Sequence, residues 1–284
     1  MNNLQKNKLF DKSFQLLGMV FTLFGVLILV VLIYKIMAAG YHRLNWDFLT
    51  SLPSRIPEKA GIYTAIIGTL DLMILTIIFA IPIGVGAGIY LEEYSKKSKL
   101  ASLLEINIAN LAGVPSIIYG LLGLGIFVRF FGFGGSILSG ALTLSLLILP
   151  ILIVATREAI KAVPSSLKEA SFALGASKWQ TIQKVILPSS FGGILTGIIL
   201  ALSRAIGETA PLIVVGAMAY VPFVPHSVFD PFSVLPMQIF TWTTRPQEGF
   251  AIAASAAIIV LLVITFIMNG IAVYFRNKWQ SKWK

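Results

Sequence analysis

The stretch PSSLKEASFALGASKWQTIQKVILPSSFGGILTGIILALSRAIGETAP, residues 164–211, combines two unlike halves. The first half is polar and contains glycine and proline, in a chain that is otherwise mostly apolar. The second half carries Arg204 and Glu208 inside a hydrophobic run, where charged side chains are costly and usually functional. Both halves therefore need a functional explanation.

The composition of the whole chain is that of an integral membrane protein. Hydrophobic residues make up 57% and charged residues 12% of the 284 residues, whereas soluble domains average about 25% charged residues. The absence of cysteine excludes disulfide bonds, thiolate metal sites and cysteine nucleophiles. His42 and His226 both lie between hydrophobic runs, so we expect no metal or haem site built on paired histidines.

Six hydrophobic runs predict an all-α polytopic membrane protein with six transmembrane helices. The runs cover about residues 14–37, 61–91, 103–131, 137–155, 191–219 and 250–275. The first run is too long for the apolar region of a cleaved signal peptide, so we expect it to be an uncleaved helix.

Two of these runs contain glycine and proline. The second run holds GVGAG at residues 84–88, small residues that let neighbouring helices approach closely. The third run holds GVPSIIYG at residues 113–120, which predicts an interrupted helix with backbone groups along a polar passage. Asp71 lies well inside the second run, where it either lines a pathway or makes a structural hydrogen bond.

Residues 157–188 are too polar to span a membrane and predict a helix, a glycine turn and a second helix. S-x-x-E at residues 166–169 and S-x-x-Q at residues 177–180 both fit the capping box that starts a helix. Gly175 is expected at the end of the first helix. Pro188 is expected to close the second helix and to start the fifth membrane helix.

Basic residues are distributed unequally between the two sides of this six-helix topology. Segments on the side of the N-terminus contain 15 lysines and arginines, and segments on the other side contain 4. The positive-inside rule therefore places both termini and residues 157–188 in the cytoplasm. Since topology explains the net charge of +10, we expect no nucleic-acid partner.

Residues 169–188 carry a recognisable pattern. Glu169-Ala170-Ser171, Gly175 and Val185-Ile186-Leu187-Pro188 resemble the E-A-A, G, I-x-L-P signature of the permease subunits of ABC importers. Ser171 replaces the second alanine and Val185 the isoleucine, both with little change in size. The resemblance implies a coupling helix between the fourth and fifth membrane helices, docked on a cytoplasmic ATPase subunit. The residues expected at this contact are Glu169, Ala170, Ser171, Gly175, Leu187 and Pro188.

A wider resemblance, over roughly residues 60–275, is to the phosphate permeases of this family. It is carried by GTLDLMIL, AIPIGVGAGIYLEEY, NLAGVPSIIYGL and especially LSRAIGETAPLIVVG. It divides the chain into three parts. We expect residues 1–59 to form a cytoplasmic N-terminus, the first transmembrane helix and an outer loop, residues 60–275 to form the ABC-importer permease domain, and residues 276–284 to form a basic cytoplasmic tail.

Arg204 and Glu208 are four residues apart and are expected on one face of the fifth helix. The planar donor fork of arginine suits two phosphate oxygens, and Glu208 can accept the proton of hydrogen phosphate. Pro211 cannot donate to the carbonyl group of Gly207, which predicts a hinge at these two residues. The alternative is a structural Arg-Glu pair that joins helices. Arg157 either receives phosphate at the cytoplasmic mouth or is an ordinary positive-inside anchor.

We therefore predict a membrane-spanning permease subunit of an ATP-driven importer of inorganic phosphate, which works by alternating access in the inner (cytoplasmic) membrane of a bacterium. The chain has no G-x-x-x-x-G-K-[ST] loop, so ATP and Mg²⁺ are expected on a partner ATPase. We expect no catalytic residue, metal site or cofactor in this chain. The resemblance also implies a second permease and an external phosphate-binding protein as partners, with membrane lipid around them.

Three alternatives remain from the sequence. An ABC permease for another oxyanion or small solute would keep the 157–188 segment without needing Arg204 and Glu208. An ion channel made of this chain alone would leave that segment unexplained. An intramembrane enzyme is disfavoured because the membrane runs contain no H-E-x-x-H, cysteine or histidine.

Overall fold

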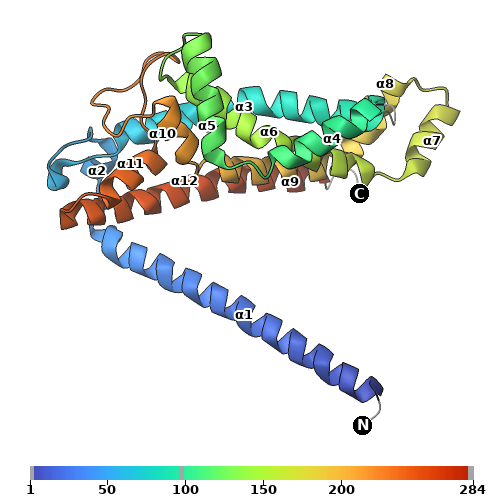
Figure 1. Cartoon of the computed structure of the whole chain (residues 1–284), viewed down its shortest axis with the longest axis horizontal. Coiled ribbons are helices and arrows are strands. Elements are labelled where there is room, and N and C mark those ends of the chain that lie inside the picture. Colours follow the sequence, from blue (N-terminus) through green and yellow to red (C-terminus); the bar gives the residue numbers. More distant parts are fainter. Residues whose placement is uncertain (1–2, 96–98, 281–284) are drawn as a thin grey trace.

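A computed structural model describes residues 3–95 and 99–280, which form helices joined by loops and turns (Figure 1). No β-strand occurs in these two ranges. The elements are, in chain order, α1 (Asn3–Gly40), η1 (Tyr41–Arg43), α2 (Trp46–Thr50), η2 (Pro57–Lys59), α3 (Tyr63–Ile89), η3 (Tyr90–Tyr94), α4 (Lys99–Leu111), α5 (Ser116–Gly123), η4 (Leu124–Phe130), α6 (Ile137–Lys161), α7 (Ser165–Ala173), α8 (Lys178–Thr181), η5 (Ile182–Ile186), α9 (Leu187–Ala205), α10 (Ala210–Val215), α11 (Leu235–Thr243) and α12 (Glu248–Gln280). Of these, η3, η4 and η5 are π-helical.

Within the described residues, five helical stretches are long and apolar enough to cross a membrane. They are Phe10–Arg43, Tyr63–Tyr94, Ile137–Lys161, Lys178–Ala205 and Glu248–Trp279. The third predicted run is divided instead: α4 ends at Leu111, and α5 begins after Pro115 in a different direction (Figure 1). The interruption predicted from GVPSIIYG is therefore confirmed, and the apolar part that follows it, Ser116–Phe130, is shorter than the other spans.

Helix α6 packs between α3 and α9 (Figure 1). Gly84 and Gly88 of α3 lie so close to α6 that an added Cβ would meet the Cβ atoms of Leu152 and Thr156 at 2.7 and 2.6 Å. Two glycines of α9 make the same kind of contact with α6, Gly193 with Ala159 and Gly197 with Ala155. Because residues four apart share one helix face, these small residues let three helices pack closely, as predicted for GVGAG.

Helix α1 lies apart from the other helices over most of its length (Figure 1). Gly40, its last residue, packs against the backbone of Ser255 and Ala256 in α12. The side chains of Phe10–Ile33 are exposed. Packing within this chain therefore holds α1 mainly through its C-terminal end.

The two ends of the bundle differ in character. The basic end (residues 157–188 and 276–280) carries α7, α8 and the last turns of α12, and the loop end (residues 41–62 and 216–247) carries α2 and α11 (Figure 1). At the loop end, Nη2 of Arg43 lies 2.6–3.1 Å from the carbonyl oxygens of Pro57, Glu58 and Ala60. This side chain therefore holds the loop before α3 in place.

The predicted helix, glycine turn and helix are present at the basic end. Gly175 follows α7 with φ +79°, a conformation that glycine adopts without steric cost. Its N–H donates to the carbonyl of Phe172 at 2.9 Å, and the N–H of Ala176 donates to that of Ser171 at 3.2 Å, which together form a Schellman motif. The capping box at residues 177–180 is also confirmed.

Two details of this segment differ from prediction. The capping box predicted at residues 166–169 is wrong, because α7 begins at Ser165, two residues earlier than a helix capped by Ser166 would, and its N-cap is Pro164, which has no side-chain acceptor. Pro188 does not close the second helix, because α8, η5 and α9 follow one another without a loop. Proline is tolerated in the first turn of α9, and the π-turn before it widens the backbone. Helix α8, which starts at Lys178, is therefore continuous through η5 with α9, the helix that carries Arg204.

Candidate functional site

Arg204 and Glu208 lie on the two sides of a break between α9 and α10. Helix α9 ends at Ala205 and α10 begins at Ala210. Nε of Arg204 donates to Oε1 of Glu208 at 3.4 Å, so the two side chains still pair across the end of the helix. The expectation that one helix face carries both residues is therefore corrected.

The break occurs near the proline that predicted it. Pro211 lies in the first turn of α10 and has no N–H to donate to the carbonyl of Gly207. The space around Gly207 is open, since an added Cβ there would meet no neighbouring atom. An interruption of helix α9 is thus present where the sequence predicts one. That Gly207 and Pro211 act as a hinge stays a prediction.

Arg204 keeps most of its hydrogen-bonding capacity free. Its side chain is 37% exposed and that of Glu208 is 18% exposed. Among the described residues, Nε of Arg204 donates a hydrogen bond to Glu208, and neither terminal nitrogen donates one. An arginine in this state can offer two parallel N–H groups to a pair of anionic oxygens.

The interruption between α4 and α5 lies beside the interruption between α9 and α10. Gly120 of α5 packs on Pro211, where an added Cβ would lie 2.8 Å from Cα and 2.9 Å from the carbonyl oxygen. The hydroxyl of neighbouring Tyr119 donates to the carbonyl of Leu111 at 2.9 Å and so bridges the first interruption. The contact between Gly120 and Pro211 therefore connects the two interruptions.

Tyr119 and Ser203, the residue before Arg204, were not among the site residues predicted from the sequence. Oγ of Ser203 lies 2.9 Å from Oδ1 of Asn269 in α12. Tyr119 is the phenolic residue of GVPSIIYG, and Asn269 is an amide within the last hydrophobic run. A search for polar groups inside those runs would have found both, although not their partners.

Asp71 lies in a different place from Arg204. It lines a cavity of about 250 Å³ together with Ile137 and residues 225–228 of the loop end, and neither Arg204 nor Glu208 is part of that lining. In the same loop, the carboxylate of Asp230 accepts the N–H groups of His226 and Ser227 at 2.8 and 2.9 Å. These bonds hold the pKa of Asp230 below its ordinary value. A pathway role for Asp71 stays a prediction.

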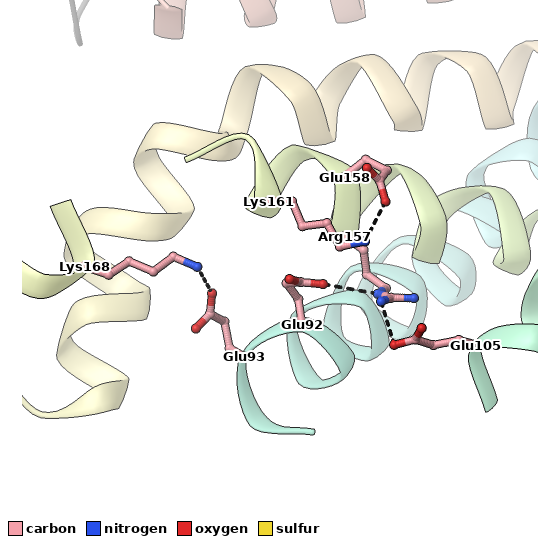
Figure 2. Close-up of polar contacts among 7 residues, drawn as sticks. All are labelled: Glu92, Glu93, Glu105, Arg157, Glu158, Lys161 and Lys168. Carbon is pink, nitrogen blue, oxygen red and sulfur yellow. Dashed lines mark hydrogen bonds and ion pairs between the residues drawn. The ribbon is translucent and has the colours of Figure 1, made fainter. Parts of the chain in front are cut away.

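Arg157, in the last turns of α6, lies between two carboxylates (Figure 2). Its Nε donates to Glu92 of η3 at 3.4 Å, and its Nη2 donates to Glu105 of α4 at 2.7 Å. The side chain is 13% exposed. Since both partners are acidic, receipt of phosphate by Arg157 would require at least one of them to move, and it stays a prediction.

The residues predicted to contact an ATPase lie at or near the tip of the basic end. Glu169, Ala170 and Gly175 are exposed, while Leu187 and Pro188 are half-buried at the start of α9. Oγ of Ser171 lies 2.9 Å from Oγ1 of Thr181, and this bond joins α7 to α8. Three apolar side chains of the same tip are also exposed: Phe172, Leu174 and Trp179.

The fold and the basic-end segment together define a membrane permease of the importer type. Residues 80–280 match the family described as "Binding-protein-dependent transport system inner membrane component". The chain therefore belongs to this family of transport permeases.

Among similar proteins, the phosphate transport system permease protein PstA of Yersinia pestis is 34% identical over 92% of this chain and 88% of its own length. PstA 1 of Mycobacterium tuberculosis H37Rv is 33% identical over 87% of this chain and 81% of its own length. The probable ABC transporter permease protein YqgI of Bacillus subtilis is 37% identical over 79% and 75%, respectively.

Solved structures of ABC transporters have the same fold. A chain of a bacterial transporter involved in import of the acidic polysaccharide alginate has a TM-score of 0.67 and 15% identity, over 96% of this chain and 99% of that one. A chain of the MetNI methionine transporter in an inward-facing conformation has a TM-score of 0.63 and 17% identity, over 77% and 97%. The predicted all-α permease fold is thereby confirmed.

Proposed function

We propose that this chain is the membrane-spanning permease subunit of an ATP-driven importer that moves inorganic phosphate into the cytoplasm by alternating access. The single observation that carries the choice of substrate is Arg204, a half-exposed arginine beside a helix break, with both terminal nitrogens unbonded among the described residues. The similarity to phosphate transport permeases over most of the chain supports the same substrate.

The chemistry of this pair suits hydrogen phosphate. A cation inside the membrane is costly unless it faces protein or a water-filled passage, so we place Arg204 on the transport pathway. The 3.4 Å bond to Glu208 is long for a charge-assisted bond, and an oxyanion can replace it. Glu208 can then accept the proton of hydrogen phosphate, which fully ionised sulfate does not offer.

The partners of this permease follow from the same assignment. We propose that the α7–α8 segment (residues 165–181) docks on an ATPase that binds ATP and Mg²⁺, with Leu174, 89% exposed, at its tip. A second permease would complete the passage, and an external phosphate-binding protein would deliver the anion. A structural relative is described in complex with an alginate pentasaccharide-bound periplasmic protein, which is the same kind of partner.

The continuous helix from α8 through η5 to α9 suggests how docking could act on the substrate. It runs from Lys178 to Ala205 without a loop, and Arg204 lies in its last turn. A rigid displacement of α8 would therefore move Arg204 relative to α10. In this proposal, both termini and the basic end lie in the cytoplasm of a bacterium, and the chain lies in its inner membrane.

Uptake by the importer reconstituted in proteoliposomes tests this function. We expect ATP-dependent accumulation of labelled phosphate, inhibition of this uptake by unlabelled phosphate, and little inhibition by sulfate or molybdate at the same concentration. Failure of phosphate to compete would assign the permease to another solute, and equal competition by sulfate would refute the proposed selectivity for phosphate. Ion conduction by the purified chain without ATP would favour the channel alternative.

A further inference from the structure

Segment η3 (Tyr90–Tyr94) continues α3 at the basic end, and two adjacent carboxylates of it bind different helices (Figure 2). Glu92 accepts a bond from Arg157 of α6 at 3.4 Å. Glu93 accepts a bond from Nζ of Lys168 in α7 at 2.5 Å. One acidic pair therefore joins the end of α3 both to a membrane helix and to the α7–α8 segment.

The ring of Tyr94 extends this contact to α8. Nζ of Lys178 lies over it, 4.9 Å from the ring centroid, within the range of a cation–π interaction. Ser95, which follows, ends the π-turn with a hydrogen bond from its N–H to the carbonyl of Tyr90 at 2.9 Å. Three consecutive side chains of η3 thus contact α6, α7 and α8 in turn.

The Glu93–Lys168 pair is well shielded from solvent compared with a surface pair nearby. The side chains of Glu93 and Lys168 are 11% and 23% exposed, whereas those of Glu158 and Lys161 are 64% and 44% exposed. Exposed pairs contribute little because water and salt screen them. Removal of one partner of a shielded pair leaves a poorly solvated charge, which is more costly. The Glu158–Lys161 pair therefore serves as a matched control.

An apolar cluster forms another contact between α3 and this end of the bundle. Ile182 and Ile186 of η5 and Ile160 of α6 are fully buried, and Ile89, the last residue of α3, packs against them. Apolar contacts are not directional, so they allow sliding between α3 and η5. The ion pairs of η3 fix the position of α3 along this contact.

The chain itself connects the α7–α8 segment to two of the membrane helices and not to the third. Residues 162–164 join α6 to α7, and η5 joins α8 to α9. Helix α3 ends at Ile89, 76 residues before the segment begins at Ser165, and reaches this segment through side chains. A displacement of the segment therefore moves α6 and α9 through the chain itself, whereas α3 follows through its packing on α6 and through the side-chain contacts of η3.

We propose that Glu93 is a positioning residue for transport: its bond to Lys168 ties η3, the continuation of α3, to α7, so that this end of α3 keeps its place when the α7–α8 segment is displaced. The neighbouring Glu92–Arg157–Glu105 contacts extend the same connection to α4 (Figure 2). The proposal rests on the proposed function as an ATP-driven permease. It adds to that function a side-chain route beside the continuous helix α8–η5–α9.

The first test measures phosphate transported per ATP hydrolysed by the whole importer in proteoliposomes. Glu93→Gln and Lys168→Gln should each lower this ratio about tenfold, because one partner of a shielded pair is left unpaired. The exchanged pair Glu93→Lys with Lys168→Glu should recover it to within about threefold, since a restored contact is non-additive with the single changes. Lys161→Gln, in the exposed control pair, should leave the ratio unchanged.

A normal ratio in Glu93→Gln would overturn the proposal, and so would an exchanged pair as poor as the single variants. Co-purification with the ATPase shows that each variant assembles. Uptake by the unchanged importer tests the proposed function separately from the role of Glu93.

A second test does not depend on the substrate. The chain has no cysteine, so spin labels can be placed specifically at Tyr90→Cys and Leu167→Cys, both exposed positions. With Glu93 present, the distribution of distances between the two labels, on η3 and α7, should stay narrow through the ATP cycle. In Glu93→Gln the distribution should broaden, and in Lys161→Gln it should not. An unchanged distribution in Glu93→Gln would overturn the proposal.

Discussion

The contact between α5 and α10 gives a prediction whose size follows from the structure. Gly120→Ala adds one Cβ that would lie 2.8 Å from Cα of Pro211, 2.9 Å from its carbonyl oxygen and 3.0 Å from Cβ of Val214. None of these atoms can move away by a side-chain rotation. Carbon atoms pack at about 3.5–4.0 Å, so the two helices would have to separate by about 1 Å.

This separation would act on the candidate site directly. Helix α10 follows the break that holds Glu208, and α5 carries Tyr119 next to Gly120. Overpacking of this kind costs about 1–3 kcal/mol. A displacement of about 1 Å of the groups that position a substrate can also greatly reduce the rate of the step that they support. We expect phosphate uptake to fall at least about tenfold, the factor that corresponds to about 1.4 kcal/mol.

Gly125→Ala provides the matched control, because an added Cβ at this position of η4 meets no atom within 4 Å. Both variants should be purified in the whole importer, with uptake in proteoliposomes and the thermal unfolding midpoint measured side by side. Equal uptake by the two variants would refute the reasoning. A loss in Gly120→Ala that a lower unfolding temperature accounts for entirely would refute the link to the site.

Three further predictions concern other parts of the chain. Arg204→Gln should abolish phosphate uptake while the importer still assembles, whereas Arg129→Gln, which changes an arginine in the last turn of η4, should retain most uptake; near-normal uptake in Arg204→Gln would leave Arg204 a structural role. The Gly175→Pro variant cannot adopt φ +79° at this position, so it should uncouple ATP hydrolysis from transport. Normal transport by a variant that still co-purifies with the ATPase would contradict this. Because Asp230 has a lowered pKa, its cap on the amide of His226 should persist at neutral pH and be lost as the pH falls through the lowered pKa, below the ordinary 3.8. Hydrogen-exchange protection of that amide, compared with Asp230→Ala, which removes the acceptor, measures this; protection that is unchanged at pH 2, or equal in the variant at neutral pH, would count against it.

Local sequence was sufficient wherever a few neighbouring residues decide the conformation. The end of α7 at Gly175, the capping box at residues 177–180 and the interruption at residues 113–120 were all predicted, because each depends on hydrogen bonds and steric limits within one or two turns. The apolar runs predicted the membrane class for the same kind of reason, since their length alone matches the bilayer.

Prediction failed where helix continuity depends on packing. Pro188 was expected to end a helix, yet the helix continues through it because a π-turn precedes it. Ile182 and Ile186 of that turn are buried against Ile160 of α6. A proline signal is local, whereas the burial that overrides it comes from another helix.

The charged stretch at residues 164–211 shows the same division. By itself the sequence determined that Arg204 and Glu208 lie four residues apart in a membrane run and that a polar helical segment precedes them. Only the tertiary structure decided that the pair spans the end of α9, that Gly120 packs a second helix interruption against nearby Pro211, and that Arg157 is held by Glu92 and Glu105. The partners of a charge come from helices distant in the chain, and side-chain spacing along one helix carries no information about them.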